Sequence, residues 1–83
     1  MDYERIKPDK IIVHHTADPS LAEQFQKVNL YHKERGFPIS SLGYWGGYHY
    51  LIERNGTVRQ YRQPDEIGAH TRGRNRESVG IGL

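Results

Sequence analysis

The hydrophobic positions of the chain fall into short runs, and the first run is apolar throughout. Ile11, Ile12 and Val13 are consecutive β-branched residues, and two histidines follow them. A short continuous run of this kind predicts a strand that opens at Lys10 and is covered on both of its faces. The turn-forming residues 18–20 then end this first element.

The next segment has the spacing of an amphipathic helix over residues 21–35. Its apolar stripe consists of Leu21, Phe25, Val28 and His32. Ser20 and Glu23 have the spacing of a capping box at the start of this helix. Gly36 is placed to end it, because glycine readily adopts the left-handed conformation that closes many helices.

A β-hairpin is predicted farther along, where two strand-like segments flank Asn55-Gly56. The strands are expected over residues 48–52 and 57–61, since Asn-Gly favours the tight turn that joins antiparallel strands. A two-residue loop would place Tyr50 opposite Tyr61. Alternation would then give one face of the first strand to Tyr48, Tyr50 and Ile52.

Two polar, irregular segments surround the hairpin: residues 37–47, rich in glycine, serine and proline, and residues 63–78. Residues 79–83 have the pattern of another buried strand, so the domain is expected to end inside a core strand. We interpret residues 1–9 as an N-terminal extension and residues 10–83 as a partial domain. One helix among several strands predicts an α/β or α+β protein in which a helix flanks a sheet.

Composition limits the chemistry available to this chain. It has 83 residues, no cysteine and five histidines, so a bound metal would have to rest on histidine, carboxylate or water. The formal net charge is +2, and Arg72, Arg74 and Arg76 lie close together in the sequence. These arginines are either part of a solvated loop or part of a surface that attracts an anionic polymer. No nucleic-acid-binding motif accompanies them, which argues against nucleic acid as a partner.

Two features bear on where the chain acts. No apolar run approaches the roughly 18 residues that a membrane-spanning helix needs, so no membrane insertion is expected. Residues 1–5 lack the apolar core of a signal peptide, so synthesis in a cytoplasm is expected.

The five histidines are the first candidates for metal binding, and each also has an ordinary structural interpretation. His32 lies in the middle of the helix, where packing is more common than ligation, and His49 is expected to make a structural hydrogen bond. His14 and His15 are neighbours on a strand and therefore face opposite sides of the sheet, so only one of them can serve a given site. His70 lies in a loop, a position that favours function over packing.

Tyr48 is a further candidate for a role in chemistry. A tyrosine at the start of a strand is usually half-buried structure. Beside a metal, its phenol could instead donate a hydrogen bond to a developing oxyanion, or orient a metal-bound water.

Four segments, in this order, resemble the type-2 N-acetylmuramoyl-L-alanine amidases and the related peptidoglycan recognition proteins. They are residues 11–17 (IIVHHTA), residues 31–37 (YHKERGF), residues 47–58 (GYHYLIERNGTV) and residues 68–81, which contain His70 and Asn75. Each segment alone is a weak signal, but the ordered set is specific and extends to the last residue. The resemblance includes the short phage lysozymes with amidase activity.

The resemblance implies both a fold and a chemistry. The chain is similar to the N-terminal two thirds of the family's mixed-sheet fold. The implied reaction is zinc-dependent hydrolysis of the amide bond between N-acetylmuramic acid and L-alanine in peptidoglycan, with Zn²⁺ activating a water molecule. By motif match, His14 is a zinc ligand and Tyr48 is the catalytic tyrosine. The residues expected to bind the muropeptide are His70, Thr71, Arg72 and Asn75.

The resemblance also implies that the zinc site is incomplete in this chain. In the family, a second histidine and a cysteine or aspartate ligand lie after the strand that here ends at Leu83. One remaining ligand would hold zinc poorly, since catalytic zinc normally has three protein ligands. An oligomer could rebuild a site by bringing His14 and His70 of neighbouring chains together. Action on the bacterial wall would require release of the chain from the cytoplasm.

Two other functions stay open on the sequence alone. A binding module could recognise muropeptides without cutting them, although retention of His14 and Tyr48 argues mildly against this. A regulator could act through a protein partner, which nothing in the sequence names. Muropeptide affinity without cleavage would indicate the first alternative, and a specific partner without muropeptide affinity would indicate the second.

Overall fold

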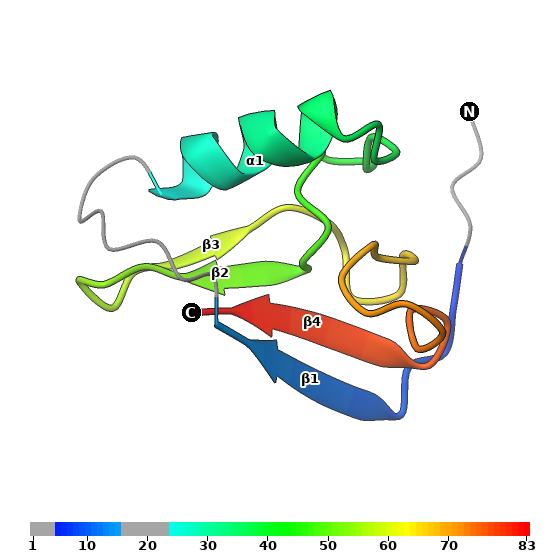
Figure 1. Ribbon diagram of the computed structural model, residues 1–83. Coiled ribbons are helices and arrows are strands. Elements are labelled where there is room, and N and C mark those ends of the chain that lie inside the picture. The colour runs from blue at the N-terminus through cyan, green and yellow to red at the C-terminus, as the bar shows by residue number, and fades with distance from the viewer. Residues whose placement is uncertain (1–4, 16–23) are drawn as a thin grey trace.

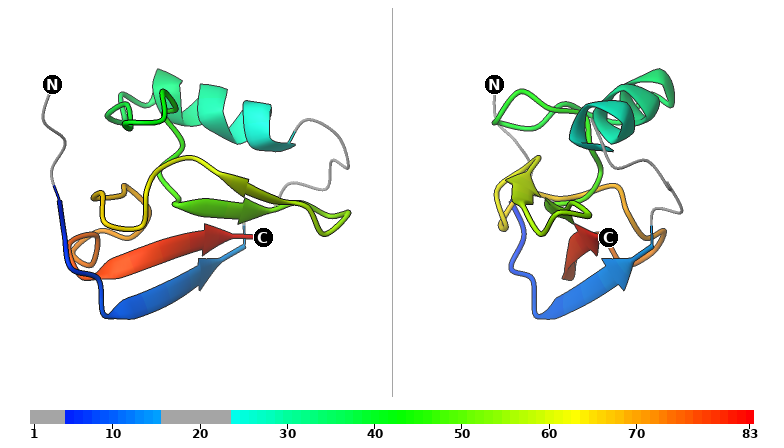
Figure 2. Two further views of the ribbon diagram at one scale, coloured as in Figure 1. Left: turned by 180° about the vertical axis from the view of Figure 1, so that it is seen from behind. Right: turned by 90° about the vertical axis from the view of Figure 1, so that its left-hand side faces the viewer.

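The fold is a mixed sheet with one flanking helix, as the sequence predicts. The computed structural model describes residues 5–15 and 24–83. The elements along the chain are β1 (Lys10–His14), α1 (Gln24–Glu34), β2 (Tyr50–Ile52), β3 (Val58–Gln60) and β4 (Ser78–Gly82). The strands form one sheet in the order β1-β4-β2-β3. The helix lies beside β2 and β3, and β1 is the strand farthest from it (Figures 1 and 2).

The parallel part of the sheet is built around β4. Both β1 and β2 run parallel to β4, whereas β2 and β3 form an antiparallel hairpin. The register pairs Ile12 with Gly80 and His14 with Gly82. A glycine inside a strand often marks a place where another group approaches the backbone closely. That is the case here, because ring atoms of His70 lie over Gly80 and the ring of Tyr48 lies over Gly82.

The helix packs through the stripe that the sequence predicts. Phe25 is buried and its ring stacks on Tyr61 with centroids 4.3 Å apart, while Leu51 completes the buried apolar cluster. Val28 packs against this cluster from the next turn. Gly36 has a φ of +81°, which confirms that it ends the helix in the left-handed conformation. The predicted capping box (Ser20 and Glu23) and Leu21 lie outside the described residues.

The hairpin has a different register from the predicted one. Tyr50 lies opposite Gln60, and Ile52 lies opposite Val58, so the predicted pairing of Tyr50 with Tyr61 is wrong. The loop has three residues rather than two, because the N–H of Gly56 donates to the Glu53 carbonyl at 2.8 Å. Gly56 has a φ of +89°, as expected for a three-residue loop that ends in a left-handed residue.

The first strand is not covered on both faces, contrary to the expectation from its apolar run. Ile11 and Val13 are 68% and 58% exposed, although Ile12 between them is half-buried. Side chains alternate along a strand, so one face of β1 is covered and the other is open. The described part of the chain supplies cover on the His14 side only.

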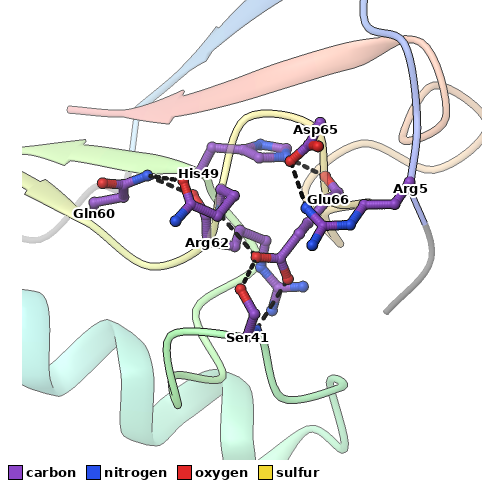
Figure 3. A network of polar contacts seen from close by, with 8 residues as sticks. Arg5, Ser41, His49, Gln60, Arg62, Asp65 and Glu66 are labelled. Carbon is purple, nitrogen blue, oxygen red and sulfur yellow. Dashed lines mark hydrogen bonds and ion pairs between the residues drawn. The ribbon is translucent and has the colours of Figure 1, made fainter. Parts of the chain in front are cut away.

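A buried arginine joins the loops on the helix side of the sheet (Figure 3). Arg62 is 2% exposed, and its guanidinium donates to three backbone carbonyls at 2.9 Å each. These acceptors are Pro38, Gly46 and Ile67. Buried charge is tolerated only when its donors are satisfied, so Arg62 holds two irregular loops in one fixed arrangement.

Glu66 reinforces the same network from the other loop. Its carboxylate accepts hydrogen bonds from the N–H and hydroxyl of Ser41 and from the N–H of Gln63. Burial alone would raise the pKa of Glu66, but these donors and the nearby Arg62 charge bring it below the usual value. The carboxylate therefore stays ionised and keeps the loop around Ser41 in place.

Residues 5–9 run alongside this network. Arg5 forms an isolated bridge with Glu66, and Ile6 is buried and donates its N–H to the Asp65 carbonyl at 2.7 Å. Within residues 5–15 and 24–83, no helix is long and apolar enough to cross a membrane.

Candidate functional site

The candidate site lies at the carboxyl end of β1, where His14 meets the loop that carries His70. His14 Nε2 is 3.0 Å from His70 Nδ1. Thr71 Oγ1 is 2.9 Å from His14 Nε2 and 3.1 Å from His70 Nδ1. Two ring nitrogens and one hydroxyl oxygen therefore converge within a single chain, whereas the sequence suggested this pair only between neighbouring chains. His15 lines a separate cavity, in agreement with the prediction that the adjacent histidines do not share a site.

The hydrogen bonds around His70 indicate which of its ring nitrogens carries the proton. The Ser78 hydroxyl donates to the Arg74 carbonyl at 2.7 Å, so its remaining role toward His70 Nε2, 3.4 Å away, is that of an acceptor. A proton on Nε2 would satisfy this contact and leave the lone pair of Nδ1 facing His14. Burial and the neighbouring histidines lower the pKa of His70 to about 4, so this ring is neutral at pH 7.

Tyr48 stands between His14 and the helix. Its ring centroid is 5.4 Å from that of His14 and 5.5 Å from that of His32. Burial raises the pKa of Tyr48, so the phenol keeps its proton at neutral pH. Tyr48 is therefore a hydrogen-bond donor that borders the histidine pair.

The predicted alternation for Tyr48 is wrong. β2 begins at Tyr50, so Tyr48 lies outside the strand. The Tyr48 ring instead lies over Gly82 together with the side chain of Leu51. This departure from the strand turns Tyr48 toward His14 rather than to the far side of the sheet.

A groove of about 460 Å³ opens beside these residues. Its walls come from the end of α1, the residues before β2 and the loop before β4. The lining residues are Tyr31, His32, Arg35, Phe37, Tyr48, Ala69, His70, Thr71, Arg72 and Asn75. The groove thus brings Tyr48 together with the four residues that the resemblance assigns to substrate binding, and His14 contacts three of the lining side chains.

Sequence reasoning missed the wall that the helix end supplies. Arg35 and Phe37 follow the last helical residues, and the Arg35 guanidinium lies 5.7 Å from the Phe37 ring centroid. The signal was present in the sequence, because an aromatic and a basic residue directly after a helix lie at its carboxyl end. Together with Arg72, the described lining contains two arginines and no carboxylate. The groove is therefore suited to an anionic ligand.

Asn75 fixes the shape of the loop that carries the site. Its Oδ1 accepts the backbone N–H of His70 at 3.0 Å and that of Thr71 at 2.9 Å. The Ala69 N–H donates to the Gly47 carbonyl, which ties the loop to the residues before β2. Asn75 therefore lines the groove while its acceptor oxygen serves the backbone, and the predicted binding role would fall to its amide nitrogen.

His32 and His49 have the structural roles that the sequence favours for them. His32 Nδ1 accepts the Gly47 N–H at 2.7 Å, and His49 Nδ1 accepts the Gly80 N–H at 3.0 Å. His49 Nε2 must then carry the proton, and it donates to the Glu66 carbonyl at 2.6 Å. Burial is the main cause of the lowered pKa of both rings, and that of His32 falls to about 4.

Gly80→Ala is expected to lower the free energy of unfolding by about 1–3 kcal/mol. The added methyl group would lie 2.4 Å from a His70 ring atom, so the His70 loop would have to move. Gly82→Ala is the matched control in the same strand, where the nearest side-chain atom lies 3.0 Å away. Urea denaturation followed by circular dichroism measures both. A larger loss for Gly82→Ala than for Gly80→Ala would contradict this reading of β4.

The sequence was compared with known protein families. Residues 4–83 match the N-acetylmuramoyl-L-alanine amidase family, Amidase_2. The chain belongs to this family. Among curated relatives, it is 35% identical over 81 residues to an endolysin of Escherichia phage T7 and 33% identical over 81 residues to one of Klebsiella phage KP32.

Solved structures of amidases have the same fold. The amidase LysC from Clostridium intestinale URNW superposes with a TM-score of 0.74 at 30% sequence identity, over 99% of this chain and 53% of LysC. The endolysin of Thermus scotoductus bacteriophage Ph2119 gives 0.74 at 28% identity, over 96% of this chain and 49% of that one. The peptidoglycan recognition protein PGRP-Hd from Alvinella pompejana, at 16% identity and a TM-score of 0.71, shares the fold.

The amidase-family chain spans about half the length of the curated relatives it matches. It aligns over 96% of its own residues with the phage T7 endolysin, but over 50% of that protein. This coverage is consistent with the partial fold that the sequence predicts.

The metal-binding capacity of the described residues rests on the histidine pair. Within residues 5–15 and 24–83, no group of three or more histidine, cysteine, aspartate or glutamate side chains is arranged to hold a metal ion. His14 and His70 supply two neutral imidazole nitrogens, the type of donor that zinc accepts. Thr71 adds a hydroxyl oxygen at the same place.

Proposed function

We propose that this chain contributes the groove and part of the metal site of a zinc-dependent enzyme that hydrolyses the amide between N-acetylmuramic acid and L-alanine in peptidoglycan. One observation carries the proposal: His14, His70 and Thr71 converge beside the protonated Tyr48 at a groove, in a chain of the amidase family. The relatives named endolysins and amidases support the same reaction class.

The ring nitrogens of His14 and His70 are of the type that binds zinc in proteins. His14 would hold the ion through Nε2, because this ring nitrogen is directed toward the site. The motif match with the family points to the same residue. Bound zinc lowers the pKa of a coordinated water to about 7 and polarises a carbonyl. His70 is neutral and turns its Nδ1 lone pair to the same volume, so it is suited to accept a proton from water or to add a second nitrogen.

Tyr48 and the arginines would act on the substrate. Hydrolysis of an amide builds negative charge on the carbonyl oxygen, and a buried phenol that stays protonated can stabilise that charge by donating a hydrogen bond. Arg35 and Arg72 both line the groove and would attract the carboxylates of a stem peptide. Arg74, in contrast, is paired with Glu77 at 2.9 Å and lies outside this lining.

A second candidate is recognition of muropeptides without cleavage. The groove and its two arginines favour it, because binding an anionic peptide requires no metal ligand. The two candidates differ in one measurable respect: removal of metal should abolish hydrolysis but leave simple recognition unchanged.

The deciding experiment is mass spectrometry of purified muropeptides after incubation with the chain and zinc, with a chelated control. Release of stem peptides that begin at L-alanine, lost on chelation, is expected if the proposal holds. Intact muropeptides that bind the chain equally well with and without chelator would support recognition alone. The same assay on meso-diaminopimelate and L-lysine muropeptides would identify the wall type preferred.

Replacement of His14 by alanine is expected to lower zinc affinity by about tenfold to a hundredfold or more, because the site loses a nitrogen donor. His15→Ala is the matched control, since the adjacent imidazole is exposed and lines a different cavity. Zinc titration by isothermal calorimetry measures both variants. Equal zinc affinity in the two variants would contradict the assignment of His14 as a ligand.

A further inference from the structure

The ring of His70 is enclosed between two glycines, and its two nitrogens have different surroundings. A Cβ placed at Gly68 would lie 2.7 Å from His70 Cδ2, and one at Gly80 would lie 2.4 Å from His70 Cγ. The imidazole therefore has little room to turn. Its Nδ1 lies 3.0 Å from His14 Nε2, whereas its Nε2 lies 3.4 Å from the hydroxyl oxygen of Ser78.

The proton of the Ser78 hydroxyl is already committed to another acceptor. Ser78 is the first residue of β4 and is 0% exposed, and its Oγ donates to the Arg74 carbonyl at 2.7 Å. The same carbonyl accepts the Glu77 N–H at 3.2 Å, so a turn keeps it in this place. A hydroxyl has one proton and two lone pairs. Toward His70, the Ser78 hydroxyl can therefore act only as an acceptor.

The other surroundings of the ring agree with a proton on the side of Ser78. The ring of His49 is 5.6 Å away, but its two nitrogens already bond the Gly80 N–H and the Glu66 carbonyl. His49 therefore does not compete for the proton of His70. Burial lowers the pKa of His70, and a hydrogen bond with the Ser78 backbone opposes that effect, as expected of an imidazole that donates toward Ser78.

We propose that Ser78 is a positioning residue that keeps the proton of His70 on Nε2 and so turns the Nδ1 lone pair toward His14 and Thr71. A neutral imidazole carries one proton, and the partner of one nitrogen decides which nitrogen holds it. With the proton on Nδ1 instead, His70 would present a donor to His14 Nε2 and would have no lone pair there for a proton or a metal ion. Ser78 does not line the groove, so it would act through His70. The inference rests on the proposed function, in which His70 acts through Nδ1.

Nuclear magnetic resonance of the metal-free chain tests this role without any need for activity. Two-bond ¹H–¹⁵N correlation spectra of the ¹⁵N-labelled 83-residue chain show which ring nitrogen of each histidine carries a proton. A His70→Gln variant identifies the His70 signals by their loss. We expect the Nε2–H form to predominate in the wild type at neutral pH. In Ser78→Ala, the ratio of the Nε2–H form to the Nδ1–H form should fall by about threefold to tenfold, because one hydrogen bond is lost.

Ser40→Ala is the matched control. Ser40 is a second buried serine, 1% exposed, and its hydroxyl also donates to a backbone carbonyl, that of Tyr61. Its replacement should lower the free energy of unfolding, as that of Ser78 does, but leave the ratio of the two His70 forms within about twofold of the wild type. An equal change of this ratio in both variants would show a general loss of structure and contradict the positioning role.

The remaining outcomes also decide the proposal. A wild-type ring with its proton on Nδ1, or with protons on both nitrogens, would overturn it even if Ser78→Ala failed to fold. An unchanged ratio in Ser78→Ala would assign the choice of nitrogen to the Ser78 backbone and overturn the role of the hydroxyl.

Kinetics connects the position of the proton to the reaction. In whichever preparation hydrolyses muropeptides, Ser78→Ala should lower kcat in proportion to the remaining fraction of the Nε2–H form, with KM unchanged. An unchanged kcat despite a changed ratio would contradict a role of Ser78 in the reaction. The expected ratios without hydrolysis in any preparation would support the placement of the proton by Ser78 and contradict the proposed function, so the two failures are distinguishable.

Discussion

An Arg62→Met variant is expected to lose about 3–5 kcal/mol of its free energy of unfolding. Methionine has a similar length, but it donates no hydrogen bonds. The carbonyls of Pro38, Gly46 and Ile67 would each lose a partner in a buried place, and Glu66 would lose its nearest positive charge. Because a domain of this size has a total stability of roughly 4–12 kcal/mol, such a loss removes a large share of it.

Arg5→Met is the control for this prediction. Arg5 pairs with Asp65 at 2.7 Å, but both side chains are more than half exposed, and an exposed pair contributes about 0–1 kcal/mol. Urea denaturation followed by far-ultraviolet circular dichroism compares the two. Arg62→Lys keeps the charge but not the three-way donation, so it should fall between Arg62→Met and the wild type. A loss below about 1 kcal/mol for Arg62→Met would show that the loops do not depend on this guanidinium.

The buried network matters for function because it supports one wall of the groove. His49 receives the Gly80 N–H and donates to the Glu66 carbonyl, which links β4 to the loop that Arg62 holds. His32 joins the helix to Gly47 in the same manner. Gly47 and His49, the two neighbours of Tyr48, are thus both held by buried polar contacts. Networks of this kind specify one arrangement when every member is satisfied, and no described buried side-chain nitrogen or oxygen lacks a partner.

The sequence predicts the elements and their chemistry where local signals are strong. The helix stripe around Phe25, the stop at Gly36 and the strand at residues 79–83 all depend on short-range spacing, and the structure has each of them. The convergence of Tyr48 and His70 could be anticipated only through the family resemblance. They are far apart in the sequence, and hydrophobic periodicity does not predict which loop residue lies beside which strand.

The errors have specific physical causes. The hairpin register changed because Arg54 joined Asn55 and Gly56 in the loop, and a shift of one residue exchanges the faces of a strand. The burial of Arg62 could not be predicted because a charged residue just after the end of a strand is usually exposed. The cover of β1 was overestimated because an apolar run indicates what a strand needs, not which segment provides it.

A Tyr48→Phe variant is expected to reduce kcat for muropeptide hydrolysis by about a hundredfold to a thousandfold, in whichever preparation hydrolyses muropeptides. The phenylalanine ring would keep the contacts with His14 and His32, so the groove and zinc affinity should persist while the donated hydrogen bond is lost. An interaction made only in the transition state lowers kcat with little change in KM. Steady-state kinetics with a defined muropeptide, together with zinc titration, separates these quantities.

Tyr50→Phe is the matched control, because Tyr50 lies two residues away and does not line the groove. Its hydroxyl should be dispensable for hydrolysis, with kcat within about twofold of wild type. If both variants kept full activity, the oxyanion would have to be stabilised by the metal alone, and Tyr48 would be a wall of the groove. If Tyr48→Phe lost zinc as well as activity, its ring would be positioning His14, and the loss of kcat would no longer report on the phenol. Only a loss of kcat with zinc retained assigns the stabilising hydrogen bond to the Tyr48 phenol.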